Sequence, residues 1–531
     1  MRAILARLFE ARFGAPPIAV IPLATDGSAR RMLRLTGPDA RTAVGVIGPD
    51  HEENRAFLSY SASFREAGLN VPEIYAVDEA AGVYLEEDLG DDLLFSLLTA
   101  ARKAEPAAAF PAGMLPVYRR VVRELPRFQV TAGKAADYRV AYPHAAYDRK
   151  SIMWDANYFK YAFLKLARVP FNEARLEDDF ERLTEFLLGA DRSHFLYRDF
   201  QSRNILMRGG APWFIDYQGG RQGALQYDIA SLLYDAKAAI PDDVRKVLLD
   251  EYLDALAGFL PVDRDRFLGH FRGYVLIRII QAMGAYGYRG FYERKRHFLL
   301  SVPYALRNIE GLMADGGFPI RVPELEDVFR RMLEMPELRQ NPEDLVETKG
   351  LTVRVGSFSY RNGIPDDLAG HGGGYVFDCR ALPNPGREPE LADFSGLDNA
   401  VVAYLEARAE VHEYWEDVRG LVERQVAAYL DRGFTSLTVQ FGCTGGQHRS
   451  VYFAERLARH LRDRNPELTV RLTHREAPRW PAPDGTPPAP PAAPPEPVSG
   501  DGAAAATGRG AGAASVVASA APLAAAILSS I

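Results

Sequence analysis

The sequence predicts an α+β unit of two lobes, followed by an α/β domain and a tail. Short strand-like runs dominate residues 1–90, and helical periodicity dominates residues 91–345. Residues 351–476 contain a strand, a glycine-rich loop, a helix and a further strand, which is typical of an α/β domain. From Ala477 to residue 531 the chain is too rich in Pro and Ala to build a core, so we expect a disordered tail.

Composition indicates a soluble globular protein in a reducing compartment. The 531 residues are 47% hydrophobic and 25% charged. The net charge of −7 argues against a general role in coating nucleic acids. With only two cysteines, Cys379 and Cys443, a disulfide framework is not indicated.

The two ends of the chain favour a cytoplasmic protein without a membrane anchor. The opening run "MRAILARLFEARFG" lacks the continuous apolar segment of a signal peptide. Residues 511–531 carry no charge, but they are mostly Ala and Ser and much less apolar than a Leu/Ile-rich span. We favour a disordered tail there over a membrane anchor.

The first lobe is predicted to begin as a small sheet. Residues 18–24, 31–35 and 43–47 read as short strands, and "TDGS" forms a turn between the first two. A helical pattern over residues 53–69 ends at Gly68. "GVYLEEDLG", residues 82–90, reads as a strand that runs into a connector.

A candidate phosphoryl-transfer site lies in the helical lobe. "FLYRDFQSRNIL" places Asp199 five residues before Asn204, and Asp216 follows the apolar run of "WFIDYQ". Phosphoryl transfer needs a carboxylate beside the acceptor hydroxyl and oxygen ligands for Mg²⁺. Taken singly, each residue would more often cap a turn or end a strand. The three together, after a strand-rich lobe, favour the catalytic interpretation.

These motifs resemble the aminoglycoside phosphotransferase and choline kinase superfamily, which has a protein-kinase-like fold. The resemblance covers about residues 15–330, and "TDGSARRMLRL" and "YRDFQSRNILM" look most like the cell-wall amino-sugar kinases. It implies ATP and Mg²⁺ as cofactors and a small sugar as substrate. It also implies that Asp199 is the catalytic base, that Asn204 and Asp216 hold the metal, and that Asp228 in "YDIASLL" is structural.

The same resemblance implies a nucleotide site between the lobes. Residues 86–89, "EEDL", would be the hinge whose backbone meets adenine. The site residues implied for the nucleotide are Ser28, Arg31, Glu87 and Leu89.

Two departures from the family pattern bear on activity. Tyr197 stands at the family's catalytic-loop histidine, so its backbone-orienting bond must be made differently. The first lysine in the chain is Lys103, so the strand-rich lobe has no lysine to grip phosphate. An arginine near the "TDGS" turn (Arg30, Arg31 or Arg34) could supply the charge, since a guanidinium binds phosphate oxygens bidentately. A degenerate kinase is the alternative.

A second candidate site is "FGCTGGQHRS", residues 441–450, between a strand and a helix. Its glycines let successive N–H groups face one point, where the helix N-terminus adds positive potential. The loop is not a Walker motif. Cys443 and Arg449 have the C-x₅-R spacing of cysteine phosphatases, but Gly442 replaces their histidine. We favour anion binding over both that catalysis and a turn without a ligand.

Residues 351–476 resemble the C-terminal domain of the RNase adapter protein RapZ family. "VGSFSYRNGIP", "VFDCRALPNP" and "GCTGGQHRSVYFAERLA" carry the likeness, which implies a domain that senses glucosamine-6-phosphate and contacts RNA. "NPGREP" departs from the family on the sugar-facing side, and the family's own Walker-loop domain is absent. The sugar-phosphate ligands implied by position are Asp378, Asn384, Thr444, Gly445, His448 and Arg449.

The two resemblances together suggest an ATP-dependent amino-sugar kinase fused to a sugar-phosphate-sensing domain. A non-catalytic nucleotide- and sugar-phosphate-binding regulator, or RNase adapter, is the alternative; antibiotic inactivation is a weaker third. The arginines of residues 447–475 alternate with acids, so RNA remains an unproven partner. Arg278, Gln281 and Tyr286 are candidates for the acceptor pocket, or equally for the core.

Overall fold

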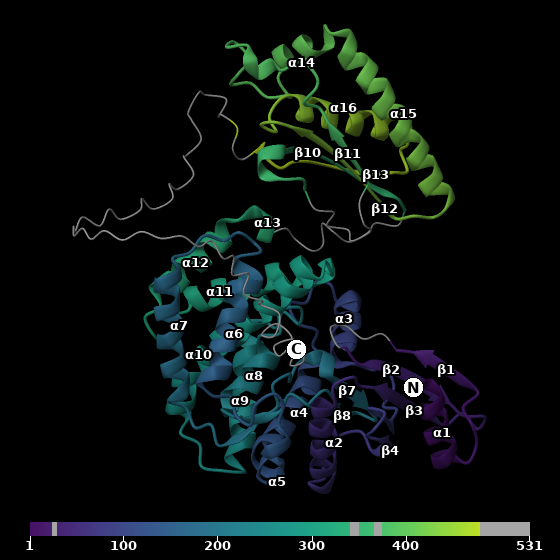
Figure 1. Ribbon diagram of the computed structural model, residues 1–531. Helices are drawn as coiled ribbons and strands as arrows, with labels where there is room; N and C mark the ends of the chain where they lie inside the picture. Colours follow the sequence, from purple (N-terminus) through teal and green to yellow (C-terminus); the bar gives the residue numbers. More distant parts are fainter. Residues whose placement is uncertain (24–28, 340–349, 366–373, 478–479, 481–531) are drawn as a thin grey trace, which may run out of the picture. The chain divides into compact units, whose positions relative to one another are not determined.

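The computed structural model describes residues 1–23, 29–339, 350–365, 374–477 and 480. They divide into two compact units, one formed by the described residues up to 339 and the other by those from 350 onward (Figure 1). The division falls within the polar stretch 335–350. The tail expected from residue 481 onward lies outside the described residues.

The first unit opens with an antiparallel sheet of five strands in the order β1-β2-β3-β5-β4. Its strands pair as expected for the three runs read from the sequence, but helix α1 and strand β4 were not predicted. The elements of this lobe are α1 (Arg2–Phe13), β1 (Ala19–Pro22), β2 (Arg31–Thr36), β3 (Thr42–Ile47), α2 (His51–Glu66), β4 (Ile74–Asp78) and β5 (Val83–Glu87).

The two faces of this sheet are covered by different helices because side chains alternate along each strand. Leu33, Leu35, Ala43, Val83 and Leu85 face α1 and cluster with its Leu5 and Phe9. The intervening residues Val44, Val46 and Tyr84 face α2 and join the main core. The sheet therefore lies between α1 and α2, and the side chains on its α2 face belong to the main hydrophobic core of the unit.

Helices dominate the remainder of the first unit, as the sequence predicted for residues 91–345. Two short antiparallel pairings, β6 with β9 and β7 with β8, interrupt them. The elements are α3 (Leu94–Ala104), α4 (Met114–Pro126), α5 (Gly133–Ala135), α6 (Arg149–Tyr158), α7 (Glu173–Leu188), β6 (His194–Leu196), β7 (Ile205–Arg208), β8 (Ala211–Phe214), β9 (Arg221–Gly223), α8 (Leu225–Leu233), α9 (Asp242–Ala257), α10 (Arg264–Gly287), α11 (Val302–Ala314), α12 (Pro323–Glu334) and α13 (Pro336–Arg339).

Helix α10 is the central element of this lobe. It packs against α6, α8 and α11, and its middle is buried on nearly all sides. Short π- or 3-10 segments continue or link several helices; they are η1 (Arg127–Ala132), η2 (Tyr138–Val140), η3 (Phe159–Leu164), η4 (Ser202–Asn204), η5 (Tyr288–Tyr292) and η6 (Arg296–Ser301). No helix in the described ranges is both long enough and apolar enough to cross a bilayer.

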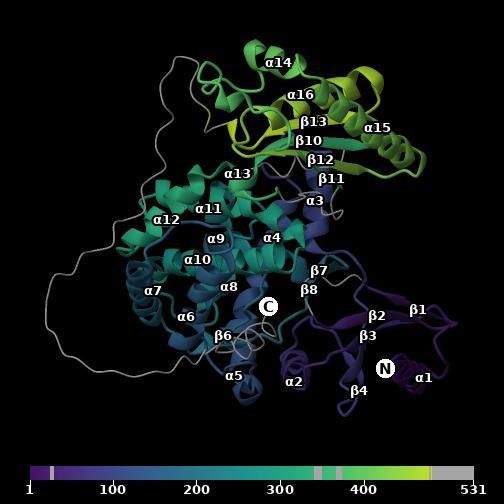
Figure 2. The ribbon, with the colours of Figure 1, turned by 45° about the horizontal axis from the view of Figure 1, so that its top comes forward.

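The second unit is a parallel four-stranded sheet in the order β11-β12-β10-β13, with α14, α15 and α16 on one side of it (Figure 2). Helix α16 packs across β10, β12 and β13. The strands and helices agree closely with those read from the sequence. They are β10 (Thr352–Ser359), η8 (Tyr360–Asn362), β11 (Gly374–Asp378), η9 (Pro385–Arg387), α14 (Asn399–Glu406), α15 (Ala409–Asp431), β12 (Ser436–Cys443), α16 (Arg449–Arg464) and β13 (Thr469–His474).

Candidate functional site

The loop that carries Asp199 is held by a buried carboxylate of helix α8. The backbone N–H groups of Tyr197 and Arg198 donate to Asp228 at 2.9 and 3.0 Å. Gln129 Nε2 donates to the same carboxylate at 3.0 Å. Burial raises the pKa of Asp228 to about 7, although these hydrogen bonds lower it. Asp228 thus fixes the backbone next to Asp199, which agrees with the structural role that the sequence indicated.

The two predicted metal ligands lie side by side. Asn204 Nδ2 donates to Asp216 Oδ2 at 3.1 Å and to the backbone carbonyl of Asp199 at 2.9 Å. Gln218 Nε2 donates to the other oxygen of Asp216 at 2.7 Å. Asp216 has a φ of 68°, a left-handed conformation that non-glycine residues rarely adopt outside functional sites. The fold therefore gathers Asp199, Asn204 and Asp216 at one place.

The side chain of Asp199 is half-buried beside the loop that follows Asp216. A Cβ added to Gly219 of that loop would lie 3.7 Å from Asp199 Oδ2, an ordinary van der Waals contact. Burial raises the pKa of Asp199, and the charge of Asp216 adds to this, while the charges of Arg198 and Arg278 lower it. A carboxylate with a raised pKa is suited to accept a proton from a hydroxyl.

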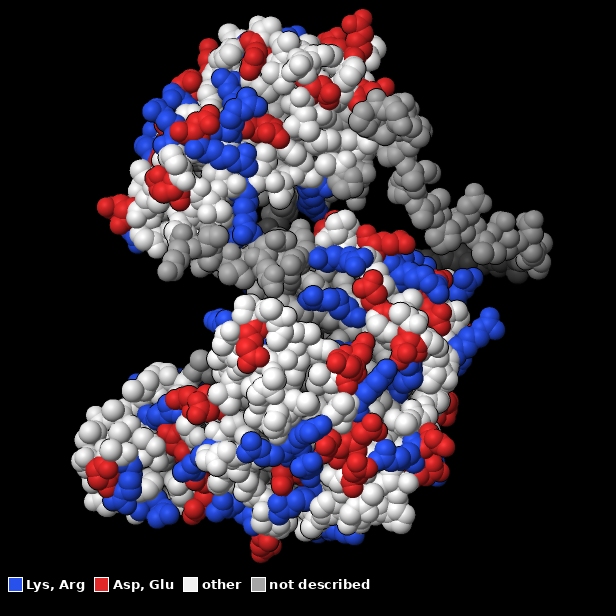
Figure 3. Space-filling view, turned by 180° about the vertical axis from the view of Figure 1, so that it is seen from behind, with Lys and Arg blue, Asp and Glu red and all other residues white. Residues whose placement is uncertain are grey.

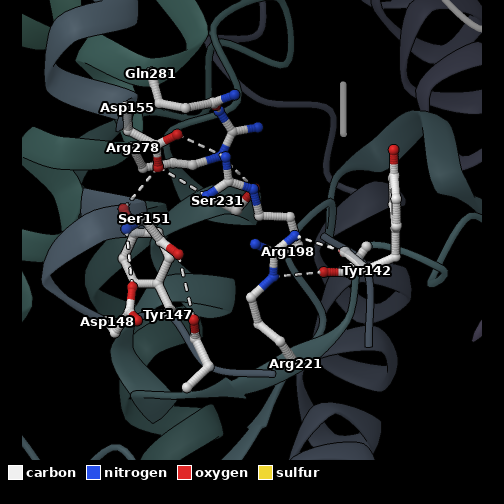
Figure 4. Close-up of polar contacts among 12 residues, drawn as sticks. Tyr142, Tyr147, Asp148, Ser151, Asp155, Arg198, Arg221, Ser231, Arg278 and Gln281 are labelled. Carbon is white, nitrogen blue, oxygen red and sulfur yellow. Dashed lines mark hydrogen bonds and ion pairs between the residues drawn. The ribbon is translucent and has the colours of Figure 1, made fainter. Parts of the chain in front are cut away.

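A buried ion pair supports the residue before Asp199. Arg198 donates from Nη1 and Nη2 to the two oxygens of Asp155, each at 2.7 Å, and Tyr147 donates its hydroxyl to Asp155 at 2.7 Å (Figure 4). Arg198 and Asp155 are only 6% and 5% exposed. The pair links helix α6 to the loop that carries Asp199 through a bidentate contact, which fixes direction as well as distance.

Two further arginines lie in the same group. Arg221 donates to the carbonyls of Gly219 and Tyr142 at 2.9 and 3.1 Å, and burial together with the charge of Arg198 lowers its pKa to about 10. Arg278 of α10 donates to Ser231 Oγ at 2.9 Å and to Gln281 Oε1 at 2.5 Å (Figure 4). Both are buried, and across the described ranges no carboxylate comes within 4.0 Å of either guanidinium.

The glycine-rich loop of the second unit opens between β12 and α16. Gly446 has a φ of 69°, and a Cβ there would lie 2.9 Å from the backbone N of Ser359, so the loop needs glycine at this position. Ser359 Oγ donates to the carbonyl of Thr444 at 2.7 Å. Thr444 and Gly445 are exposed, and a Cβ on Gly445 would meet no atom within 4 Å. The loop thus presents an open face beside the N-terminus of α16.

Other predicted ligands lie around this loop. A Cβ on Gly386 would lie 3.0 Å from His448 Cε1 and 3.7 Å from Asn384 Oδ1, so the fold brings Asn384 and His448 together. His448 Nε2 lies 3.2 Å from the carbonyl of Leu391, and burial lowers the pKa of the imidazole. Asp378, by contrast, pairs locally with Arg380 at 2.6 Å.

Arg449 has a role that its spacing did not reveal. Its Nη1 donates to the carbonyls of Arg380 and Leu382 at 2.9 and 2.8 Å, and the residue is 4% exposed. It therefore holds the segment after β11 against the first turn of α16. Cys443 is likewise buried and accepts the N–H of Gly446 at 3.2 Å. A buried thiol and an arginine bonded to carbonyls do not favour the phosphatase alternative.

Two family profiles match the chain. Residues 20–266 match the phosphotransferase enzyme family, and residues 351–478 match the RapZ C-terminal domain. The chain thus joins a phosphotransferase-family domain to a RapZ C-terminal domain. The protein-kinase-like fold expected for the first domain and the α/β fold expected for the second are confirmed.

Curated relatives match over short stretches. A "Nucleotide-binding protein" of Methylobacillus flagellatus is 45% identical over 121 residues, which cover 23% of this chain and 41% of the relative. A protein of the same description from Halorhodospira halophila is 43% identical over 130 residues, or 24% of this chain and 43% of the relative. The chain therefore spans less than half the length of these relatives.

Solved structures with similar folds include kinases of small molecules. Choline kinase LicA from Streptococcus pneumoniae aligns with a TM-score of 0.40 and 13% identity, over 59% of this chain and 99% of LicA. The amicoumacin kinase hAmiN, solved in complex with AMP-PNP, Ca²⁺ and Ami, aligns with a TM-score of 0.40 and 13% identity, over 65% of this chain and 97% of hAmiN. The expected closeness to amino-sugar kinases in particular is not among these findings.

In the phosphotransferase domain, Tyr197 stands at the family's histidine position and orients the backbone through its hydroxyl group. Tyr197 donates its hydroxyl to the carbonyl of Ile215 at 2.6 Å. Ile215 precedes Asp216, and its own N–H donates to the carbonyl of Asn204 at 3.1 Å. Tyr197 therefore ties the loop that carries Asp199 to the segment that carries Asp216.

The predicted nucleotide residues of the phosphotransferase domain that the structure describes are Arg31, Glu87 and Leu89. Ser28 lies outside the described residues. Arg31 is exposed on β2, and Leu89 is buried in the connector between the lobes. Glu87, at the end of β5, forms an ion pair with Arg208, and its N–H donates to the carbonyl of Glu73 at 2.8 Å.

The donor set near Asp216 is compatible with Mg²⁺. Within the described ranges, no group of three or more His, Cys, Asp or Glu side chains could hold a metal ion. Mg²⁺ in phosphoryl-transfer sites, however, is held by one or two protein oxygens together with substrate phosphates. The carboxylate of Asp216 and the carboxamide of Asn204 provide such a pair of groups.

Sequence reasoning missed Asp155 and Arg221. Asp155 lies inside an ordinary helical pattern, and Arg221 in "GGRQG" reads as a turn residue. Their importance arises from contacts between residues far apart in the chain, since Asp155 and Arg198 are 43 positions apart. The one sequence signal was the group of arginines around the "YRDF" and "GGRQG" motifs.

Proposed function

We propose that the phosphotransferase domain transfers the terminal phosphoryl group of ATP to a hydroxyl of an amino sugar. The observation that carries the proposal is the convergence of Asp199, Asn204 and Asp216, with Asn204 Nδ2 3.1 Å from Asp216 Oδ2. Asp199 would accept the proton of the acceptor hydroxyl as its oxygen forms the new P–O bond and the bond to ADP breaks. Asn204 and Asp216 would hold Mg²⁺, which neutralises phosphate charge when bound.

The charges around Asp199 favour an acceptor that carries an anionic group. Arg221 and Arg278 are buried near Asp199, and the acceptors of their hydrogen bonds are neutral oxygens. Asp199 is one carboxylate beside two buried guanidinium groups, and buried charge without a counter-charge is costly. A carboxylate on the acceptor would therefore balance the site. N-acetylmuramate has such a carboxylate, whereas N-acetylglucosamine does not.

Acceptor choice tests this proposal. With ATP and Mg²⁺, we expect ADP release with N-acetylmuramate at a higher kcat/KM than with N-acetylglucosamine or simple alcohols. Arg278→Gln should raise the KM for N-acetylmuramate about tenfold or more, as expected for a lost charged hydrogen bond, and leave that for N-acetylglucosamine nearly unchanged. The control is Arg266→Gln, an exposed position on the same helix.

Other outcomes have clear meanings. Equal losses for both sugars would show that Arg278 only supports the fold. Nucleotide binding without transfer to any acceptor would favour the non-catalytic regulator. The absence of any lysine before Lys103 is the sequence feature that supports this alternative.

We further propose that the RapZ C-terminal domain binds an amino-sugar phosphate at the loop Thr444–His448. The exposed face of Gly445 and the N-terminus of α16 support an anion site there. On the face seen in Figure 3, arginines of this domain lie close together with acids among them, so RNA contact stays an alternative.

One position of this loop gives a sharp test. Since a Cβ on Gly445 would meet no atom within 4 Å, Gly445→Ala should bind glucosamine-6-phosphate much as the natural protein does. Gly445→Asp would add a negative charge to the same space and should weaken binding at least tenfold. Isothermal titration of the full chain measures both, and equal affinities for the two variants would exclude a phosphate at this loop.

A further inference from the structure

Strand β3 of the phosphotransferase domain has no basic residue. Its sequence is TAVGVI, and the first lysine of the chain is Lys103. Val44 and Val46 point into the main core, and a Cβ on Gly45 would lie 2.8 Å from Leu35 on the opposite face. Any cation that binds nucleotide phosphates from this lobe must therefore come from outside β3.

Arg30 is a buried cation that lies against helix α2 and interacts with the charge of Asp216. It directly precedes β2 and is 7% exposed. Its Nη2 is 3.3 Å from Glu53 Oε1, in the first turn of α2, and its guanidinium lies 5.5 Å from the ring centroid of Phe57, one turn later on that helix. An ion pair and a cation–π contact thus hold the side chain against α2.

The charges near Arg30 connect it to the metal-binding carboxylate. Coulombic interactions with Tyr84, Glu53, Asp216 and Glu86 raise the pKa of Arg30, while burial lowers it. Burial raises the pKa of Glu86 to about 8, so that side chain is mostly protonated at neutral pH. The remaining carboxylates are Glu53 and Asp216.

Glu53 and Asp216 lie close enough to influence each other. Burial raises the pKa of Glu53, the charge of Arg30 lowers it and the charge of Asp216 raises it. Gln218 donates to Asp216 at 2.7 Å, and its hydrogen bonding also lowers the pKa of Glu53. Arg30 and its partner Glu53 therefore belong to the same polar group as Asp216.

The other two arginines near the turn are placed differently. Arg31, the next residue along the chain, is exposed. Arg34 donates from Nε and Nη2 to Asp88 and from Nη1 and Nη2 to Asp91, at 2.7 to 3.0 Å. Two carboxylates of the connector between the lobes already neutralise Arg34, so Arg30 is the arginine of the three that lies within the influence of Asp216.

We propose that Arg30, positioned by Glu53, binds the nucleotide phosphates in place of a lysine on β3. This rests on the proposed function. A planar guanidinium can contact Glu53 along one edge and a phosphate oxygen along another, which an ammonium at the same point could not do with the same geometry. The arginine before β2 and the carboxylate on α2 thus serve as the charge pair of this lobe.

The test compares ATP with adenosine, which has the same base and ribose but no phosphate. By isothermal titration in Mg²⁺, Arg30→Gln should weaken ATP binding by about 10- to 100-fold and leave adenosine binding unchanged. Glu53→Gln should weaken ATP binding by a smaller factor, because it removes only the positioning contact. Arg41→Gln, at an exposed position directly before β3, is the matched control and should bind both ligands normally.

Several outcomes would overturn the proposal. Unchanged ATP binding by Arg30→Gln, or equal losses of ATP and adenosine, would show that Arg30 only packs the lobe. If Arg30→Gln does not fold, Arg30→Lys retains the charge without the fork and should weaken ATP binding about tenfold, again without an effect on adenosine. A protein that binds ATP but phosphorylates nothing would remove the transfer proposal alone, and one that binds no ATP would remove both.

Discussion

Asp199→Asn is expected to lower kcat by about three orders of magnitude and to leave the fold intact. The substitution preserves size and removes the group that would accept the proton, an effect of about 10²–10⁴ for a general base. Burial already raises the pKa of Asp199, so the neutral amide relieves an electrostatic cost of folding. We therefore expect a Tm equal to that of the natural protein or higher, with ATP affinity within about threefold of it. Single-turnover ADP formation and thermal unfolding measure these quantities.

Asp191→Asn is the matched control for this prediction. Asp191 lies three residues before β6, is exposed, and accepts hydrogen bonds from Ser193. Its substitution should leave kcat unchanged. If Asp199→Asn turned over the acceptor as fast as the natural protein, no base would act at this position and the proposed transfer would fail.

Local sequence signals were enough to predict most of the fold. The glycine-rich loop between β12 and α16 was placed within a residue or two, because apolar alternation, glycine and helical periodicity follow one another without conflict. Helix α1 was missed, although Leu5 and Phe9 are four residues apart and Gly14 ends the helix with a φ of 82°. Charged residues recur throughout this short helix, so its apolar face is narrow and the helical pattern is weak.

Strand β4 (Ile74–Asp78) was missed for a different reason. It lies at the edge of its sheet, is only partly buried, and has an irregularity in its pairing with β5. Short edge strands carry a weak alternation of apolar and polar residues, so the sequence pattern there resembles a loop.

The candidate site was only partly predictable. The spacing of Asp199, Asn204 and Asp216 identified the residues that converge, because they lie on one loop and the end of one hairpin. Sequence could not choose between Arg30 and Arg31, since adjacent residues near a strand point to opposite sides. Nor could it find the partner of Arg198, because that contact depends on how α6 packs against the catalytic loop.

Asp155→Asn is expected to destabilise the phosphotransferase domain by about 3–5 kcal/mol. The change leaves Arg198 as a buried cation without its carboxylate partner, and breaking one side of a buried ion pair has a cost of this size. Arg221 lies nearby, so the uncompensated positive charge adds to the cost. We expect a lower Tm for the first unit and a lower kcat, since Arg198 adjoins Asp199. Calorimetry resolves the transition of this unit.

An exposed ion pair of helix α6 serves as the control, because it shows how much stability an ion pair contributes when it is not buried. Arg149 and Glu181 are 2.6 Å apart and about half exposed, so Glu181→Gln should change the stability by less than about 1 kcal/mol.

The double variant Asp155→Leu/Arg198→Met removes both buried charges and should recover much of the stability lost by Asp155→Asn, because it removes the cost of desolvating them. It should not recover kcat, since the bidentate contact that directs the catalytic loop is gone. A loss of less than about 1 kcal/mol for Asp155→Asn would mean that the hydrogen bonds of Asp228, and not this pair, hold the loop.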